Sequence, residues 1–305
     1  MSFFRFFVFV SLGLLFSGGS FVFAAMSSTN YQIQWDSFSA GGSDVGSSDS
    51  YKIRDSLGSN GLGIGSSTSY ELQSGFRPGV FDQVAAFQVF GQTSTFTTAS
   101  ALSDTQITVA DSSSFSAGDY IALVQDIGAS QVAAIGKVAA PVIVGFLTVD
   151  FFKNGGSAPT IDGTNDKVYK LSGASAALGT LSASAVTTSI IGFEASADTG
   201  NGYSISVLSD GALRFGASDV NGVSDGVVTA GSEEYGGRSS DTTLANSTFD
   251  TADTAFTTSP QEVATESNAA FQSRNFVTLK ASFNSTSSTN ASYAQALSFV
   301  LSGNF

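Results

Sequence analysis

The stretch Tyr203-Ser204-Ile205-Ser206-Val207 places large apolar residues at every second position, with serine between them. Successive side chains of a β-strand point to opposite faces, so this pattern predicts a half-buried strand. The alternation returns in Val277-Thr278-Leu279-Lys280-Ala281-Ser282-Phe283 and again near the end, at Tyr293, Leu297, Phe299 and Leu301. No segment after residue 24 shows a sustained helical period, so we expect the rest of the chain to be all-β.

The composition favours turn-rich extracellular β-structure. The chain has 305 residues with 33 Gly, about one and a half times the usual ~7%, and only 12% charged residues against a usual ~25%. It contains no Cys and no His. These absences exclude disulfides, thiol nucleophiles, zinc sites built on Cys or His, and a Ser-His-Asp triad.

The charge balance is acidic. Lys and Arg number 12 and Asp and Glu 25, for a net charge of −13. Nucleic-acid binding requires clustered basic residues to neutralise phosphates, so we expect no nucleic-acid partner.

The first 24 residues have the order of a secretory signal peptide. One basic residue, Arg5, precedes an apolar run over residues 6–16, and Val22-Phe23-Ala24 supplies small residues for cleavage. Cleavage after Ala24 removes one of the 12 basic residues and leaves a net charge of −14. No later segment reaches the roughly 20 apolar residues of a spanning helix, so we expect a secreted chain located at the cell surface.

A threefold repeat opens the mature chain, over residues 25–79. Each unit contains small polar residues, then a tyrosine, then an Ile or Leu two positions later; the tyrosines are Tyr31, Tyr51 and Tyr70. We interpret each unit as a turn, a short strand and a Gly-rich return, such as residues 58–65. The three strands would form a small meander with one apolar face.

The remaining chain divides into three parts. Residues 80–104 form a linking strand region that could belong to the sandwich. Residues 105–171 carry short apolar runs separated by Gly, Pro and Asp, which predicts a small β-barrel or meander. The alternating strands of residues 172–305 predict a C-terminal β-sandwich.

Several segments resemble a group of secreted β-sandwich surface proteins of candidate-phyla bacteria, themselves similar to WxL-type surface domains. The segments are LGTLS at 178–182, GNGYSI at 200–205, GSEEYG at 231–236, SYAQAL at 292–297, and the N-terminal Asn30-Tyr31-x-Ile33-x-Trp35-Asp36. The resemblance implies an exported cell-surface β-sandwich with a further β-module ahead of it. It carries over no catalytic residue.

One loop is a weak calcium candidate. Asp219, Asn221 and Asp225 lie in a stretch bent by Gly222 and Gly226, close to Glu233 and Glu234. Calcium takes six to eight oxygen ligands, which such a loop can supply, although the spacing does not match an EF-hand. The alternative is a solvated Asx-turn loop between strands. Apart from this calcium ion we expect no cofactor.

Four aromatic residues of the repeat region form a weak ligand-binding candidate. Tyr31, Trp35, Tyr51 and Tyr70 could provide an aromatic strip for sugar rings, although regularly spaced tyrosines on strands more often pack in a core. A paired-carboxylate glycosidase built on Glu194 with Glu233 or Glu234 is disfavoured, because adjacent glutamates of a strand point to opposite faces.

We therefore expect a secreted structural or adhesive surface protein that is not an enzyme. Its partners would be further copies of itself, other surface proteins or glycans. The alternative function is a carbohydrate- or surface-binding module. A third interpretation, an outer-membrane β-barrel, is disfavoured because only one Trp and eight Tyr are available for aromatic girdles.

Overall fold

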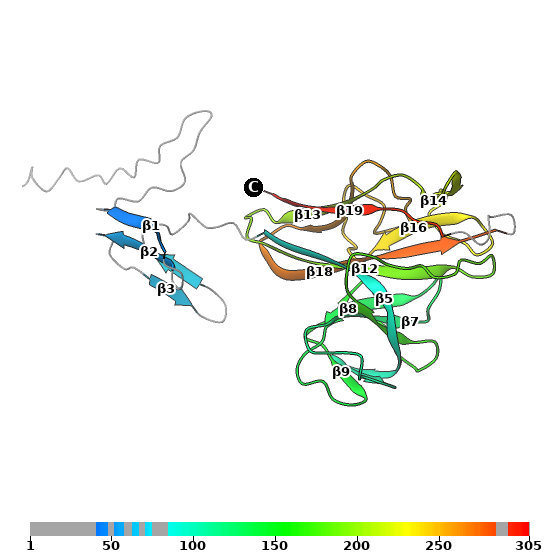
Figure 1. Cartoon of the computed structure of the whole chain (residues 1–305), viewed down its shortest axis with the longest axis horizontal. Helices are drawn as coiled ribbons and strands as arrows, with labels where there is room; N and C mark the ends of the chain where they lie inside the picture. Colours follow the sequence, from blue (N-terminus) through cyan, green and yellow to red (C-terminus); the bar gives the residue numbers. More distant parts are fainter. Residues whose placement is uncertain are drawn as a thin grey trace, which may run out of the picture. The chain divides into compact units, whose positions relative to one another are not determined.

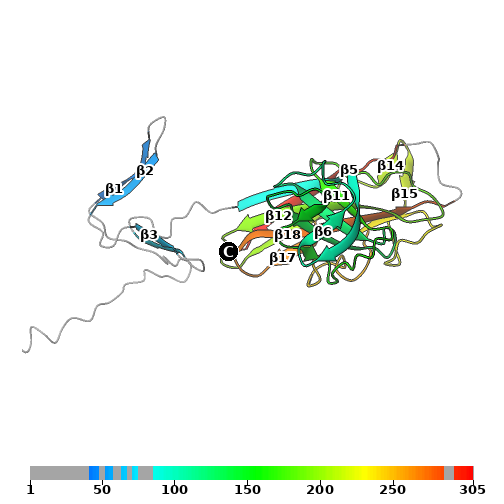
Figure 2. The same ribbon diagram turned by 90° about the horizontal axis from the view of Figure 1, so that it is seen from below.

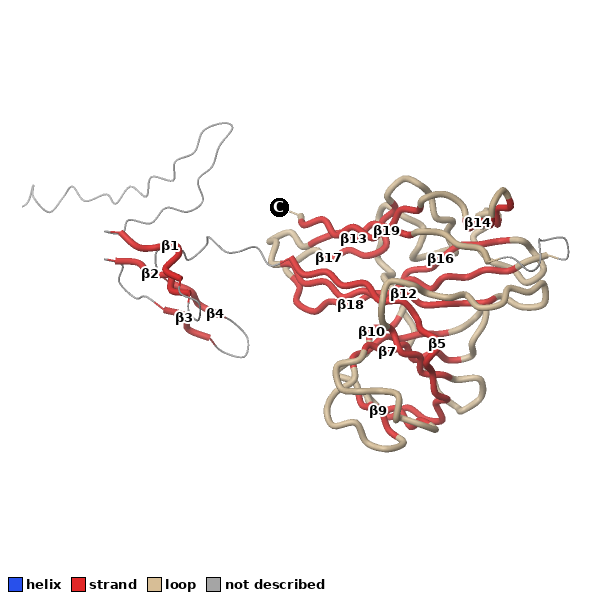
Figure 3. The backbone as a smooth tube through the Cα atoms, in the orientation of Figure 1, coloured by secondary structure: helices blue, strands red, loops and turns tan. Residues whose placement is uncertain are grey.

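The structure is a computed structural model that describes residues 41–47, 52–57, 63–66, 71–74, 85–284 and 292–304. The predicted signal peptide lies outside these residues. Every regular element in the described part is a β-strand (Figure 3), so the all-β prediction is confirmed. The described residues contain no helix long and apolar enough to cross a membrane. The chain divides into two compact units, Met1–Asp82 and Gln83–Phe305.

The first unit contains two antiparallel hairpins. Strand β1 (Gly41–Ser47) pairs with β2 (Lys52–Leu57), and β3 (Gly63–Ser66) pairs with β4 (Glu71–Ser74). Both hairpins have the same register at their turns, with Ser47 opposite Lys52 and Ser66 opposite Glu71. Of residues 58–65, interpreted as a Gly-rich return, residues 63–65 belong to strand β3, and residues 58–62 lie outside the described residues. In both hairpins, the strand after the tyrosine pairs with the Gly-rich strand before it.

The second unit is built on one long sheet whose sandwich half has the order β5-β12-β18-β16 (Figure 1). These strands are β5 (Ala85–Ser103), β12 (Thr187–Ala197), β18 (Ala270–Ser282) and β16 (Glu234–Ser239). Neighbouring strands are antiparallel throughout.

A smaller sheet covers one face of this half. It has the order β17-β13-β19, with β17 (Gln261–Glu266), β13 (Tyr203–Ser209) and β19 (Leu297–Gly303). The predicted alternation of β13 is confirmed, because Tyr203, Ile205 and Val207 are buried between the two sheets. The opposing sheet contributes buried residues of β12 and β18 to the same core; among them are Phe193, Ala195, Val277, Leu279 and Ala281. Together the two sheets form the sandwich.

The long sheet continues beyond β5 into strands that lie between β5 and β12 in the sequence. This part, which we call the module, packs against the other face of β12 and β18. Its strands are β6 (Gln106–Val109), β7 (Tyr120–Gln125), β8 (Val132–Lys137), β9 (Phe146–Thr148), β10 (Lys153–Asn154) and β11 (Lys167–Leu171). They curl around a second core, which includes Ile107, Ile121, Leu123, Leu147 and Val168. A single bridge between Val138 and Val149, rather than a ladder, joins the β8 and β9 sides, so the module is a curled sheet.

Strand β5 belongs to both parts. Its first residues, Ala85–Gly91, pair with β12 in the sandwich, whereas Gln92–Thr98 pair with β11 and Ala99–Ser103 with β6. Figure 2 shows this strand bending from one part into the other. Of the linking region expected at residues 80–104, residues 85–103 form a single strand shared by the sandwich and the module, and residues 80–84 lie outside the described residues. A short hairpin, β14 (Leu213–Phe215) with β15 (Ser218–Val220), completes the unit.

Candidate functional site

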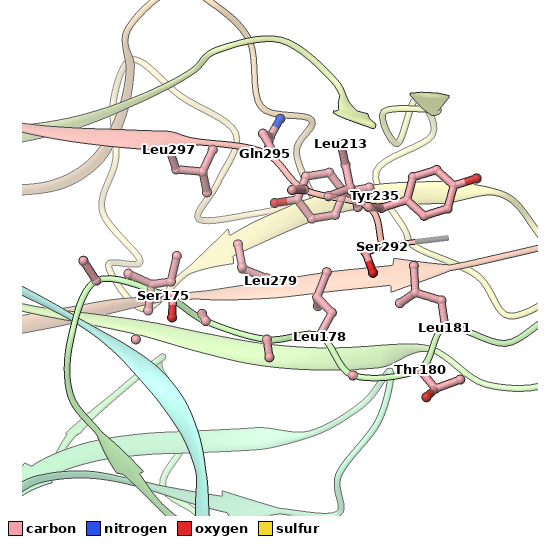
Figure 4. A pocket seen from close by; sticks show the side chains of 18 of the residues that line it. Ser175, Leu178, Thr180, Leu181, Leu213, Tyr235, Leu279, Ser292, Gln295 and Leu297 are labelled. Carbon is pink, nitrogen blue, oxygen red and sulfur yellow. The ribbon is translucent and has the colours of Figure 1, made fainter. Parts of the chain in front are cut away.

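The sandwich is open along one side. The sheet β5-β12-β18-β16 has four strands in the sandwich, but the sheet that covers it has three. Strand β19 is the last strand of the smaller sheet and pairs with β13 alone among the described strands. A cavity of about 940 Å³ lies at this open side (Figure 4). Its size is at the upper end of the roughly 300–1,000 Å³ range of ligand pockets.

Two segments form the banks of this cavity, which we call the intersheet groove. One bank is residues 174–181, an irregular segment of small and apolar residues; the other is residues 292–299, which lead into β19. The floor consists of side chains from the sandwich sheets and the β14 hairpin, including Ile191, Leu213, Tyr235 and Leu279. None of the residues that line the groove is charged. A ligand for this groove is therefore predominantly apolar and neutral.

The two banks differ in their backbone hydrogen bonds. In the second bank, Ala294 pairs with Arg214, and Leu297 to Phe299 pair with β13. Among the described residues, no backbone–backbone bond is formed by residues 174–181; the preceding Ser172 and Gly173 bond to Gly91. The outer edge of β19 likewise faces no described strand. Unpaired N–H and C=O groups along a strand edge are a template for a further strand.

Gln295 and Tyr235 are among the polar side chains that line the groove. Gln295 donates from Nε2 to the carbonyl oxygen of Gly211 at 2.5 Å, while its buried Oε1 has no partner among the described residues. Burial raises the pKa of the Tyr235 phenol far above its ordinary value. Tyr235 therefore stays neutral at physiological pH, and Gln295 Oε1 can accept one further hydrogen bond.

Gly91 of β5 lets the first bank, residues 174–181, lie close to the sheet. A Cβ atom at this residue would lie 2.1 Å from the carbonyl oxygen of Ser175. The backbone of the first bank can therefore approach β5 this closely only because residue 91 has no side chain. Side-chain patterns did not indicate this position, since the constraint comes from a segment more than 80 residues away.

The opposite face of the same sheet carries a buried ion-pair cluster, which we call the Arg274 cluster. The Arg274 side chain is fully buried and donates to both carboxylate oxygens of Asp150, at 2.7 and 2.6 Å, and to Glu194 Oε2 at 2.7 Å. The Tyr120 hydroxyl donates to Glu194 Oε1 at 2.9 Å. Glu194 and Arg274 lie opposite each other on β12 and β18, whereas Tyr120 and Asp150 come from the module.

Aromatic rings enclose the cluster. The Arg274 guanidinium lies 4.2 Å from the ring centroid of Phe151, and the Tyr120 ring stacks on Phe90 at 4.1 Å. Burial and the hydrogen bond to Glu194 raise the pKa of Tyr120 to about 12. Burial alone would raise the pKa of Asp150, but hydrogen bonds from Arg274 and from the backbone of Phe151 and Lys137 hold that pKa below its ordinary value. These paired charges join the module to the sandwich.

Glu194 is thus part of a joint and does not form a carboxylate pair with Glu234. On β18, Glu194 is opposite Arg274 and Glu234 is opposite Ser282. Eight residues of strand separate these positions by roughly 27 Å, well beyond the roughly 5–10 Å of a glycosidase pair. Glu234 instead accepts a hydrogen bond from the backbone N–H of Thr229.

The residues of the calcium candidate take separate positions. Asp219 is exposed on β15 opposite Arg214, and Asp225 Oδ1 accepts the backbone N–H of Val227 at 3.0 Å, which forms an Asx turn. Asn221 Nδ2 donates to Glu233 Oε1 at 3.3 Å. Within the described residues, no group of three or more acidic, His or Cys side chains is placed to hold a metal ion. Calcium binding here remains a prediction.

The aromatic strip predicted from Tyr31, Trp35, Tyr51 and Tyr70 lies outside the described residues, so it also remains a prediction. Comparison of the chain with known protein families, curated proteins and solved structures found no match.

Proposed function

We propose that this chain is an exported surface protein with a structural or adhesive role and no catalytic activity. The observation that carries the proposal is the open side of the sandwich, where β19 presents an unpaired edge beside an uncharged groove. Such an edge supports association by strand addition. The signal-like residues 1–24 and the Ser-, Thr- and Gly-rich composition support an extracellular location.

The roles of the buried acidic groups support a non-catalytic chain. Asp166 accepts backbone N–H groups of Asp126, Asp162 and Gly163, and Asp241 accepts those of Thr243 and Thr265. Asp253 pairs with Lys280 at 2.8 Å. Each of these carboxylates serves as a hydrogen-bond acceptor for loops, a role that stabilises the fold.

The test is the mass of residues 25–305 in solution, measured by light scattering after size exclusion over a concentration series. We expect assemblies that grow with concentration, with electron microscopy showing a repeated filament or lattice. A monomer at every concentration, with no binding to surface proteins or glycans, would contradict the proposal.

A second candidate function, carbohydrate binding, is favoured by exposed aromatic residues of the module. Phe96 is 49% exposed, its ring lies 5.6 Å from that of Tyr169, and Lys167 Nζ lies 4.5 Å from its centroid. An exposed aromatic face beside a cation can stack against a sugar ring. A glycan screen with F96A tests this function, and F215A, which removes an equally exposed ring from the β14 hairpin, is the matched control. Equal glycan binding by both variants and the parent would contradict it.

A further inference from the structure

We infer that the intersheet groove accepts the N-terminal segment of a second copy, residues 30–36, as an added β-strand beside β19. This inference rests on the proposed function and deepens it, because it names the partner and the contact. The smaller sheet has three strands and faces four, so it is one strand short of a complete second layer.

The groove has the chemistry of a missing strand. Leu297, Phe299 and Leu301 of β19 point into the sandwich yet are only half-buried, as are Phe87 and Val89 of β5 on the facing sheet. These half-buried residues lie on either side of the open edge. A strand placed between them would bury its own inward side chains and cover those already present. Its backbone would bond to the free edge of β19.

The segment Asn30-Tyr31-Gln32-Ile33-Gln34-Trp35-Asp36 has the pattern that this groove requires. Its large apolar residues Tyr31, Ile33 and Trp35 are at alternate positions, so all three face one side of a strand. The groove, with a volume of about 940 Å³, is at the upper end of the roughly 300–1,000 Å³ range of ligand pockets and has room for large side chains. Gln32 and Gln34 would face solvent.

The first repeat also differs from the other two in what precedes it. The strands after Tyr51 and Tyr70 pair with Gly-rich strands that lie directly before those tyrosines, β1 and β3. Before Tyr31, the mature chain offers only residues 25–30, AMSSTN, which contain no glycine and are too few for a comparable strand and turn. With residues 1–24 removed, the sequence before Tyr31 therefore has no Gly-rich segment of the kind that precedes Tyr51 and Tyr70.

Charge favours a contact of this kind between copies. Each mature copy carries a net charge of about −14, so close approach of two charged faces is opposed by repulsion. The groove lining carries no charge, and the segment 30–36 carries a single charge, on its last residue, Asp36. Because the donor segment and the acceptor edge are different surfaces, the contact repeats from copy to copy and builds a filament.

The decisive variant is I33D in the mature chain, compared with Q32D as the matched control. Both add one negative charge to the same segment, but Ile33 faces the groove in our proposal and Gln32 faces solvent. We expect I33D to raise the dissociation constant of assembly at least about a hundredfold, and Q32D to change it by less than about fivefold. Equal effects of the two variants would overturn the inference while leaving the proposed function intact.

Trp35 reports the same event directly, because it is the only tryptophan of the chain. Its emission should shift to shorter wavelength as the protein concentration rises, and I33D should abolish the shift. A blue-shifted emission that is independent of concentration in a monomer would overturn the inference, since the segment would then be buried within its own chain. A parent that stays monomeric with solvent-exposed Trp35 would overturn both the inference and the assembly function.

Cross-linking tests whether the segment 30–36 of one copy lies beside β19 of another. The chain has no cysteine, so Q34C in one copy and V300C in another are unique sites for a short bis-maleimide linker. Val300 is exposed on the outer face of β19, and V144C, at an exposed module tip, is the control acceptor. We expect covalent dimers from Q34C with V300C and few from Q34C with V144C. Equal yields from both pairs would place the segment elsewhere and overturn the inference.

Discussion

The two faces of the sheet formed by β5, β12 and β18 differ in how completely they are covered. Toward the module, alternate residues such as Ile190, Glu194 and Arg274 are held by paired charges, stacked rings and a closed apolar cluster. Toward the smaller sheet, the intervening residues Ile191, Phe193 and Leu279 lie in an apolar core that opens into the intersheet groove. The same strands therefore build a fixed joint on one face and an accessible apolar surface on the other.

We propose that this difference divides the roles of the two faces, with the Arg274 cluster structural and the intersheet groove a binding surface. An Arg with a bidentate carboxylate partner fixes geometry, because its planar donors accept only a narrow range of positions. The groove has no such group and defines its ligand by shape and by unpaired backbone. Substitutions on the joint should therefore change stability, and those on the groove should change association.

The largest effect is expected for R274M. It leaves Glu194 and Asp150 without their guanidinium, and breaking a buried pair from one side costs about 3 kcal/mol in the free energy of unfolding. Urea denaturation measures the loss. The double variant R274M/E194Q should recover part of it, since one of the stranded charges is removed; no recovery would show that Asp150 alone determines the cost.

A smaller loss is expected for G91A. The added Cβ would meet the Ser175 carbonyl oxygen at 2.1 Å, so residues 174–181 must move, at a cost of about 1–3 kcal/mol. G200A is the control, because no atom lies within 4 Å of a Cβ at that residue. Urea denaturation gives the free energy, and the light-scattering series should show weaker assembly for G91A alone. Unchanged assembly of G91A would show that residues 174–181 take no part in the contact between copies.

A fall in pH should weaken the Arg274 cluster before it affects the intersheet groove. The pKa of Asp150 is depressed in the folded state, so its contribution to stability is present above the unfolded pKa, near 4, and is lost as the pH falls through the lower folded value. Urea midpoints measured from pH 6 to 2 should therefore fall less steeply for R274M than for the parent. Parallel curves would contradict a role for the Arg274–Asp150 pair.

The smallest effect is expected for D225A. It removes the acceptor of the Val227 N–H and with it an Asx turn, at a cost of about 0.5–1 kcal/mol. Thermal melting in chelator and in millimolar calcium checks whether the loop has a second role. Equal melting temperatures for the parent in both conditions would exclude the predicted calcium site.

The sequence predicted those strands in which apolar and polar side chains alternate because one face packs on the core. Tyr203–Ser209 has one face in the core, so its residues carry the period of two that marks a half-buried strand. Ala270–Ser282 was predicted only from Val277 onward, and residues 274–279 are all buried because both faces of this strand are covered. The Gly-rich strands of the first unit were missed, because glycine has low strand propensity and their pairing comes from the partner strand.

The Arg274 cluster and the intersheet groove could not be predicted from the sequence, for a different reason. Arg274 meets Glu194 across 80 residues and Asp150 across 124, and no local pattern links such distant positions. The groove depends on a strand that the smaller sheet lacks, and counting strands per layer requires the topology. The segments that resemble secreted sandwiches include parts of both banks of the groove, LGTLS at 178–182 and SYAQAL at 292–297, but the resemblance assigned them no role.

The sharing of β5 also sets an order for folding. Its last residues, Ala99–Ser103, find a partner nearby in β6, since Ser103 pairs with Gln106, whereas its first residues must wait for β12, about 100 residues later. Contacts that close short loops form sooner than those that close long ones. The module can therefore form first and fix the bend of β5. The sandwich then assembles on a strand whose shape is already set.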